Sequence, residues 1–308
     1  MSADPLLSIC IATYDSRDYL QACLASIYKF PPPCSYEIVV VNDFSGDGTA
    51  EMVREEFIDV NFVENQERVG VCPAENMAFR HSNGQYVVLF DADAEFITDT
   101  LTTLFEFMQE HPGAGIVTCT LMDPDGTLQP SGRKFPTARS LLRDRLITLL
   151  RLPINIYHQP YRNYDAVEEV DEVPITCLLM PRSLGEPDGY FDEGVFVFYC
   201  DIELCHRIKF EGWKIYQVPG CQVLHHRGVN RKHPSVRLIV NGYRDELYYF
   251  KKWYPVSMVR AVKVIQAAEL CIRMIKWGLL YLAIPARRDT MRERCAGGLV
   301  LLKEIWKA

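Results

Sequence analysis

Residues 86–96, YVVLFDADAEF, constrain the fold more than any other stretch of this 308-residue chain. Residues 86–90 form a short apolar run after a turn-forming Asn-Gly pair, which predicts a strand buried on both faces, as in a parallel sheet. Asp91 and Asp93 follow at the carboxyl end of that strand, where open α/β sheets bind ligands. Two close carboxylates repel each other, and hard oxygen ligands suit Mg²⁺ or Mn²⁺. A cation site and an ordinary polar loop are equally weighted interpretations of this pair alone.

The segments around this strand alternate between strand and helix patterns. Strands are predicted at residues 6–13, 37–41 and 60–63. Helices are predicted from a cap at Asp18, over residues 49–57, and over 74–81 with Pro73 at the first helical position. Strand–helix–strand repeats at this spacing predict right-handed βαβ units and a mostly parallel central sheet flanked by helices.

The second half of the pattern is less regular. Helices are predicted at residues 98–110 and 141–150, and strands at 115–121, 175–180, 214–218 and 221–225. The run Asp-Pro-Asp-Gly at 123–126 predicts a hairpin turn, and residues 165–171 an acidic loop. The aromatic run 191–198 is predicted to line or close a pocket.

Polar residues follow each of the early strands. Thr13, Tyr14 and Asp15 follow one strand, and Asn42 and Asp43 follow the next. Because the carboxyl ends of parallel strands share one edge, these residues and the aspartate pair predict a nucleotide site. The sequence contains neither G-x-G-x-x-G nor the P-loop pattern, which disfavours dinucleotide oxidoreduction and P-loop phosphate transfer. Ser45, Asp47 and Thr49 are interpreted as helix-capping residues.

Two further groups are candidates for chemistry. Asp201 and Glu203 begin a predicted helix, where acids complement the helix dipole; the functional alternative is that one of them is a general base. His225 and His226 end a predicted strand, where a histidine beside acids can complete a metal shell. Surface imidazoles are the alternative for the histidines.

The charge of −7 is unevenly distributed. Residues 251–308 hold 12 Lys and Arg against four Asp and Glu, a net of +8, whereas the remainder holds 21 against 36, a net of −15. An acidic body without a basic stripe does not predict nucleic-acid binding. The eleven cysteines are scattered without Cys-x-x-Cys pairs, and residues 1–10 lack the features of a signal peptide, so we expect a cytoplasmic protein.

The basic tail contains a long amphipathic pattern. Over residues 258–283 the apolar positions recur at helical spacing, and arginines follow to position 294. A basic amphipathic helix predicts docking on an anionic membrane surface through residues 256–294, which would make the protein peripheral on the inner face of the membrane. Packing of this helix on the protein is the alternative. The apolar positions are Ala261, Ile265, Ala268, Ile272, Ile275, Leu279 and Leu282.

Taken in order, the motifs resemble those of family 2 glycosyltransferases, which are inverting enzymes with the GT-A nucleotide-sugar-binding fold. The resemblance covers residues 6–255, and the stretches LQPSGRKFPT and RDELYYFKKWYP are similar to those of the rhamnosyltransferase-type subgroup. The motifs that carry it are SICIATYD, VVVNDFSGDGT, NQERVGVCPAENMAF, VVLFDADAEF, GYFDEGVFVFYCDIELCHR and VPGCQVLHHRG.

The resemblance implies a role for each matching position. Thr13, Tyr14 and Asp15 would border the nucleoside, and Asp43 would accept the N3–H of uracil or thymine. Gly70 and Asn76 would lie in a segment against the nucleotide. Asp93 would bind Mn²⁺ or Mg²⁺, and Asp91 would contact the ribose or the metal. Asp201 would be the catalytic base, and His225 or His226 would contact the metal or the diphosphate.

The expected activity is therefore transfer of a sugar, with rhamnose as one option, from a UDP- or dTDP-sugar to a hydroxyl of a glycan or lipid-linked acceptor in cell-surface polysaccharide synthesis. The expected domains are a GT-A domain over 1–250, with a nucleotide half to about 120 and an acceptor half beyond it, and a helical extension over 251–308. Cys200 and the pair Thr176-Cys177 depart from the family pattern, which has Glu and Gly-Ala there. A catalytically silent scaffold and a sugar nucleotidyltransferase are the alternatives.

Overall fold

The computed structural model describes residues 5–150, 164–196, 198–227, 236–283 and 288–307. The chain divides into two compact units. The first, here called the sheet unit, comprises residues 1–135, 159–193 and 200–229. The second, here called the helical unit, comprises residues 136–158, 194–199 and 230–308. The expected division into a domain over 1–250 and an extension over 251–308 concerns function, and it stays a prediction.

The sheet unit is built around one mixed sheet of ten strands among the described residues, in the order β3-β2-β1-β4-β9-β6-β10-β5. Parallel pairing joins β3, β2, β1 and β4, and also β6 and β10. The short strands β7 and β8 pair antiparallel with β6 and β10. The strands are β1 (Leu7–Thr13), β2 (Tyr36–Asn42), β3 (Asn61–Glu64), β4 (Tyr86–Phe90), β5 (Ala94–Phe96), β6 (Ala114–Met122), β7 (Leu128–Gln129), β8 (Glu168–Glu169), β9 (Cys177–Pro181) and β10 (Lys214–His225).

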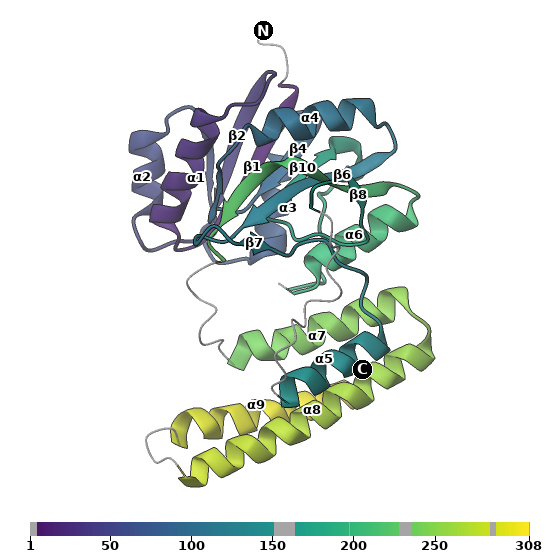
Figure 1. Ribbon diagram of the computed structural model, residues 1–308. Coiled ribbons are helices and arrows are strands. Elements are labelled where there is room, and N and C mark those ends of the chain that lie inside the picture. Colours follow the sequence, from purple (N-terminus) through teal and green to yellow (C-terminus); the bar gives the residue numbers. More distant parts are fainter. Residues whose placement is uncertain (1–4, 151–163, 197, 228–235, 284–287, 308) are drawn as a thin grey trace. The chain divides into compact units, whose positions relative to one another are not determined.

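Helices cover this sheet (Figure 1). The core lies between sheet and helices, and it contains Leu20, Leu24 and Ile27 of α1 at helical spacing against strand residues such as Val40 and Val88. The helices of the sheet unit are α1 (Arg17–Lys29), α2 (Thr49–Glu56), α3 (Val71–Arg80), α4 (Thr100–Glu110), the 3₁₀ turn η1 (Arg182–Leu184) and α6 (Cys200–Phe210).

The helical unit is a group of four described helices (Figure 1). Helix α8 packs against α5, α7 and α9, and an apolar cluster of Tyr243, Leu270, Leu301 and Ile305 joins α7, α8 and α9. The helices are α5 (Ala138–Leu150), α7 (Val236–Trp253), α8 (Val256–Ala283) and α9 (Arg288–Lys307). Among the described residues no helix is both long and apolar enough to cross a membrane.

A partly buried ionic network lies in the helical unit. The guanidinium of Arg145 on α5 lies 2.9 Å from the Glu246 carboxylate and 2.7 Å from that of Glu269. The Gln266 amide donates to Glu246, and so does the Tyr199 hydroxyl. Burial alone would lower the pKa of Arg145, but attraction by the two glutamates outweighs it and the pKa is raised.

Helix α7 also binds the aromatic residues that precede α6 in the chain. The Asp245 carboxylate accepts one hydrogen bond from the Phe196 N–H and one from the Phe198 N–H, both of 2.9 Å. The Phe198 ring lies over Gly242, where a Cβ would stand 3.2 Å from the ring. Asp245 is therefore the acceptor that orders these two amides. The predicted pocket-lining role of residues 191–198 stays a prediction.

The predicted fold class is confirmed, and the main strands and helices lie within a few residues of the predicted bounds. The hairpin turn at 123–126 is also confirmed, because β7 returns antiparallel along β6.

Several local predictions are wrong. Asp18 does not cap α1: Ser16 is the N-cap, and Asp18 lies in the first turn, where it pairs with Arg17. Pro73 is the third residue of α3 and not the first. The predicted strands at 214–218 and 221–225 are one strand, because the chain accommodates Gly220 at φ +79° through a register shift and continues to pair with β6. The acidic loop at 165–171 contains the short strand β8.

The packed face of α8 also differs from the apolar stripe predicted from the sequence. Its buried residues are Val259, Val262, Gln266, Leu270 and Trp277. The second half of the predicted stripe lies elsewhere on the helix and is exposed. The exposed stripe residues are Ile272, Ile275, Leu279 and Leu282.

Candidate active site at the carboxyl edge of the sheet

The edge where β1, β2 and β4 end gathers most of the polar residues predicted from the sequence. Thr13 and Asn42 are direct partners at the ends of β1 and β2, and β4 pairs with the other side of β1. The Asp43 N–H donates to the Thr13 carbonyl, and the Asp91 N–H donates to the Thr176 carbonyl. Parallel register therefore brings the loops that begin at 13, 43 and 91 to one edge.

A sharp reversal of the chain fixes the aspartate pair. After β4 the Ala94 N–H donates to the Asp91 carbonyl, and β5 runs back beside β10 with Ala94 opposite His225. The Phe90 and Phe96 rings stack at 4.2 Å across the reversal. The His226 N–H donates to the Asp93 carbonyl. These backbone contacts hold the loop 91–93 against the end of β10.

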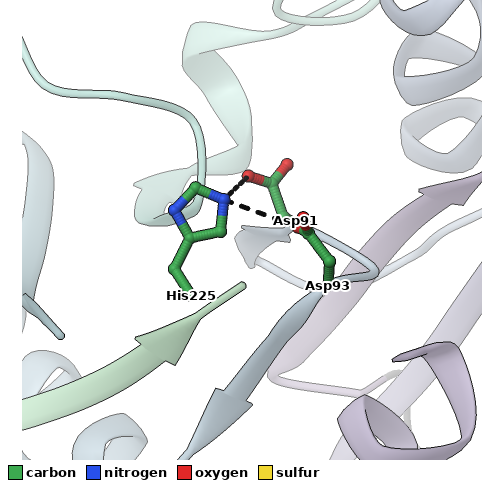
Figure 2. A group of neighbouring side chains, drawn as sticks. All are labelled: Asp91, Asp93 and His225. Carbon is green, nitrogen blue, oxygen red and sulfur yellow. Dashed lines mark ion pairs between the residues drawn. The ribbon is translucent and has the colours of Figure 1, made fainter. Parts of the chain in front are cut away.

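The reversal places two carboxylates and one imidazole together (Figure 2). His225 Nε2 lies 3.5 Å from an Asp93 oxygen and 3.8 Å from an Asp91 oxygen. One ligand atom from each residue lies within 4.8 Å of the others. The side chains are 26% exposed for Asp91, 19% for Asp93 and 10% for His225, so both carboxylates are partly exposed to solvent.

The donor atoms of this group suit a divalent cation. Two carboxylates supply hard oxygen ligands and negative charge, and an imidazole nitrogen completes a set typical of Mn²⁺ sites more than of Mg²⁺ sites. A cation held among them would also offset the repulsion between the two carboxylates.

A second layer of residues surrounds the group. The Cys23 thiol donates to the Asp91 carbonyl over 3.7 Å, and Glu75 on α3 accepts from the Ala12 N–H. Burial first, and then the charge of Asp91, raise the pKa of Glu75 well above its usual range. Behind the imidazole, His225 Nδ1 lies 2.9 Å from the side-chain amide of Gln129.

The predicted nucleoside residues lie in the adjacent loops. Asp15, at φ +46°, accepts from the Gly46 N–H, and its own N–H donates to the Ser45 hydroxyl. The Arg68 guanidinium stacks on the Tyr14 ring at 3.7 Å. The Thr13 hydroxyl is buried and makes no hydrogen bond within the described chain.

Asp43 organises the next loop. Its carboxylate is buried and accepts hydrogen bonds from the Asn65 side chain and from the Val69 and Gly70 N–H groups, at 2.8–3.0 Å. Gly70 has φ +101°, a conformation that side chains rarely adopt. The structure therefore brings Asp43 and Gly70 together. A contact of either residue with a nucleoside stays a prediction.

Asn76 and His226 are held by other partners. The Asn76 side chain is buried, accepts from the Phe191 N–H and donates to the Phe191 carbonyl. His226 Nε2 lies 2.7 Å from the Glu95 carboxylate, and its ring lies 5.0 Å from that of Tyr19. Among the described residues, His225 and not His226 joins the aspartates.

Asp201 and Glu203 begin α6, as predicted, but their environments differ. Glu203 is fully buried, whereas Asp201 is partly exposed and accepts from the Ile202 N–H. The preceding Cys200 is buried; a hydrogen bond with Cys72 and burial raise the pKa of its thiol, which stays neutral. Of these two acids, only Asp201 is partly exposed to solvent.

Sequence reasoning missed the residues that support this group. Glu75 falls on the buried face of α3 with Cys72 and Phe79, and an acid at apolar helical spacing was a detectable signal. Gln129 lies on a two-residue strand after a turn, where no pattern distinguishes it. Away from this group, Glu172 is fully buried and 3.2 Å from Arg133, and it directly follows the loop that was predicted to be acidic.

The topology and this group define a class of protein: an α/β protein with an acidic pair and a histidine that could hold a cation at the carboxyl edge of its sheet. Solved structures share the fold. A mannosyltransferase from Pyrobaculum calidifontis, solved with GDP-mannose and Mn²⁺, aligns over 98% of this chain and 88% of its own with a TM-score of 0.56 and 19% identity. The structure of GalNAc-T7 with UDP, GalNAc and Mn²⁺ has a TM-score of 0.57 at 16% identity, over 81% of this chain and 50% of that one.

The family model described as Glycosyl transferase family 2 matches residues 8–170, which is more than half of the chain. The chain belongs to glycosyltransferase family 2, and it is a glycosyltransferase with the GT-A fold.

Curated relatives include an N-acetylglucosaminyl-diphospho-decaprenol L-rhamnosyltransferase of Mycobacterium tuberculosis (strain CDC 1551 / Oshkosh), 25% identical over 72% of this chain and 76% of that protein. A putative teichuronic acid biosynthesis glycosyltransferase of Bacillus subtilis (strain 168), TuaG, is 34% identical over 40% of this chain and 50% of its own.

Proposed function

We propose that this glycosyltransferase is metal-dependent and inverting, and that it transfers a sugar from a nucleoside-diphosphate donor to a hydroxyl of a glycan or lipid-linked acceptor. The observation that carries the proposal is the group of Asp91, Asp93 and His225 at the carboxyl edge of the sheet. Open α/β sheets bind nucleotides at this edge, and a group of this kind suits a diphosphate that enters with a divalent cation.

Asp93 and His225 would hold the cation, and Asp91 would share it or contact the ribose. When bound, the cation would stabilise the negative charge that develops on the diphosphate leaving group. The imidazole in the donor set favours Mn²⁺ over Mg²⁺. Solved structures with this fold, from other glycosyltransferases, contain Mn²⁺, which supports the same choice.

The nucleoside would lie against the adjacent loops. Thr13, Tyr14 and Asp15 would border it, and Asp43 would accept the N3–H of uracil or thymine. Two observations support this arrangement: the buried Thr13 hydroxyl has no hydrogen bond in the described chain, and Asp43 shapes the loop that carries Gly70. Asn76 would act there indirectly, because its amide orders the Phe191 backbone.

Asp201 would be the base. Its carboxylate would take the proton from the acceptor hydroxyl, which attacks the anomeric carbon from the face opposite the diphosphate and inverts its configuration. The partial exposure of Asp201, beside the complete burial of Glu203, supports this choice between the two acids.

A lipid-linked acceptor is supported by the mycobacterial relative, whose name specifies a diphospho-decaprenol substrate. A basic tail with an exposed apolar stripe on α8 would let the enzyme reach such an acceptor at an anionic membrane surface. We therefore propose a role in cell-surface polysaccharide synthesis, with dTDP-rhamnose as the first donor to test.

The experiment has two stages. A thermal-shift panel of UDP-, dTDP- and GDP-sugars, each with and without Mn²⁺, identifies the donor as the one that stabilises the protein selectively. The turnover of that donor is then compared between the wild type and Asp201→Asn. We expect the variant to lose about 10²–10⁴-fold in rate while it keeps donor affinity. Near-full turnover would show that the base lies elsewhere, and stabilisation by no donor would contradict the proposed activity.

A further inference from the structure

The side-chain amide of Gln129 lies directly behind the imidazole of the cation group. Gln129 and His225 are both buried, and the amide reaches Nδ1, the ring nitrogen opposite the one that faces the aspartates. The two nitrogens of a neutral imidazole share one proton, so the partner of Nδ1 decides what Nε2 can do.

The amide has two orientations with opposite consequences. If its oxygen faces Nδ1, that nitrogen carries the proton and Nε2 presents a lone pair to the aspartates, as a metal ligand requires. If its NH₂ group faces Nδ1, that nitrogen is an acceptor and Nε2 carries the proton toward the carboxylates. The second state provides the aspartates with a hydrogen-bond donor but cannot bind a cation through Nε2.

Arg227 distinguishes the two orientations. Its Nε and Nη2 atoms face the same end of the Gln129 amide, and both can donate to that end only when it is the oxygen. Arg227 is fixed there by Asp123, with Nε 2.6 Å from one oxygen and Nη2 2.9 Å from the other. Arg227 thus favours the orientation in which Nε2 is protonated, and binding of a cation must rotate the amide against it.

We propose that Gln129 is a positioning residue that sets the tautomer of His225, and that Arg227 biases it toward the state that does not bind a cation. Cation binding then rotates the Gln129 amide and breaks its contact with Arg227. This inference rests on the proposed cation site, and it makes Mn²⁺ affinity depend on two residues that do not touch the ion.

The first test is a double-mutant cycle of Mn²⁺ affinity, measured by isothermal titration calorimetry on the full chain. Gln129→Glu presents oxygen to Nδ1–H and to Arg227 at once, so we expect Mn²⁺ to bind about tenfold more tightly. The added negative charge could also attract Mn²⁺ directly. Repeating the substitution in a His225→Ala background separates the two causes, because only the direct attraction survives there.

The second test needs no substitution at Gln129. With histidine selectively ¹⁵N-labelled, two-bond ¹⁵N–¹H correlations distinguish the two tautomers, and the His225→Ala spectrum assigns the signal. We expect a proton on Nε2 without metal and on Nδ1 after one equivalent of Zn²⁺, a diamagnetic stand-in for Mn²⁺.

Each outcome has a clear meaning. The proposal is supported if Gln129→Glu increases Mn²⁺ affinity only when His225 is present, and if the tautomer of His225 changes when metal is added. An equal gain in both backgrounds, or a proton on Nδ1 before metal is added, overturns it and leaves the cation site intact. Failure of the wild type to bind Mn²⁺ at all contradicts the cation site itself, and with it this inference.

Discussion

The acids of the helical unit and the acids at the sheet edge are arranged in opposite ways. Glu246 and Glu269 face the permanent positive charge of Arg145, which the chain itself supplies from α5. Asp91 and Asp93 face the imidazole of His225 at 3.8 and 3.5 Å, respectively. The first arrangement is complete within the protein, whereas we propose that a ligand completes the second.

This difference indicates how acids that stabilise the fold can be distinguished from acids that serve function. A buried carboxylate that meets a guanidinium and several hydrogen-bond donors stabilises a packing arrangement, and its removal should affect folding. Carboxylates that gather at a strand edge beside an imidazole cost stability until a cation arrives, and their removal should affect function. Substitutions in both units can test this contrast.

The largest effect is expected for Arg145→Met. The substitution leaves the buried Glu246 without its cation, whereas Glu269 keeps its pair with Arg273, and it should lower the free energy of unfolding of the helical unit by about 3 kcal/mol. Urea unfolding followed by circular dichroism at 222 nm measures it. Arg54→Met, which removes an exposed pair with Glu64, is the matched control and should cost less than about 1 kcal/mol. Equal losses would remove the distinction.

The next effect concerns pH. Burial raises the pKa of Glu172 to about 8, although Arg133 lowers it. The folded protein therefore retains a proton that the unfolded chain releases above its ordinary pKa, so stability falls as pH rises toward 8, by up to about 1.4 kcal/mol per pH unit. Glu172→Gln should flatten this slope. Unfolding measured from pH 6.5 to 8 avoids His206, whose pKa burial lowers to about 4.

The same slope in Glu172→Gln and in the wild type would show that Glu172 is ionised throughout this range. In that case Glu172 and Arg133 would form a fully charged ion pair like that of Glu246 and Arg145 in the helical unit.

A smaller and more local effect is expected for Asp245→Asn. One carboxylate oxygen becomes an NH₂ group that faces an N–H donor, so either the Phe196 or the Phe198 amide loses its acceptor. Hydrogen exchange should accelerate at these amides, while that of the Asp91–Asp93 loop should not change. Asp289→Asn, on an exposed position of α9, serves as the control. Unchanged exchange would mean that Asp245 does not order this segment.

The smallest effect is expected at the membrane. Ile275 and Leu279 of α8 are 66% and 63% exposed, so Ile275→Asp with Leu279→Asp should leave the fold intact. The double variant should reduce sedimentation with phosphatidylglycerol vesicles at low salt several-fold. Ile58→Asp, at an exposed position of the sheet unit, controls for a general loss of apolar surface. Absence of wild-type binding would exclude the membrane proposal.

The sequence allowed the fold class and the edge of the sheet to be predicted because both follow from local patterns. The apolar run of β4 and the spacing of strands and helices are periodic, and the aspartate pair follows its strand directly. From the sequence alone, His225 and His226 could not be distinguished as the histidine that joins the aspartates. That choice depends on the register of β5 against β10, which is a long-range property.

Other features could not be predicted for the same reason. Pro219 and Gly220 indicate a turn, but pairing with β6 outweighs that local preference and β10 continues through them. The buried face of α8 depends on α5, α7 and α9, which pack on Val262 and Leu270 and leave the more obvious apolar stripe exposed. The proposed role of Gln129 follows from its contact with the His225 ring, which no local sequence pattern indicates.

The central claim is that Asp91, Asp93 and His225 bind a cation that holds the diphosphate of the donor. The most direct measurement is the affinity of the wild type and of Asp93→Ala for UDP or dTDP, by calorimetry, with Mn²⁺ and with chelator. We expect Mn²⁺ to tighten nucleotide binding by the wild type at least tenfold and to have no effect on the variant. An equal enhancement by Mn²⁺ in both proteins, or none in the wild type, would contradict the account.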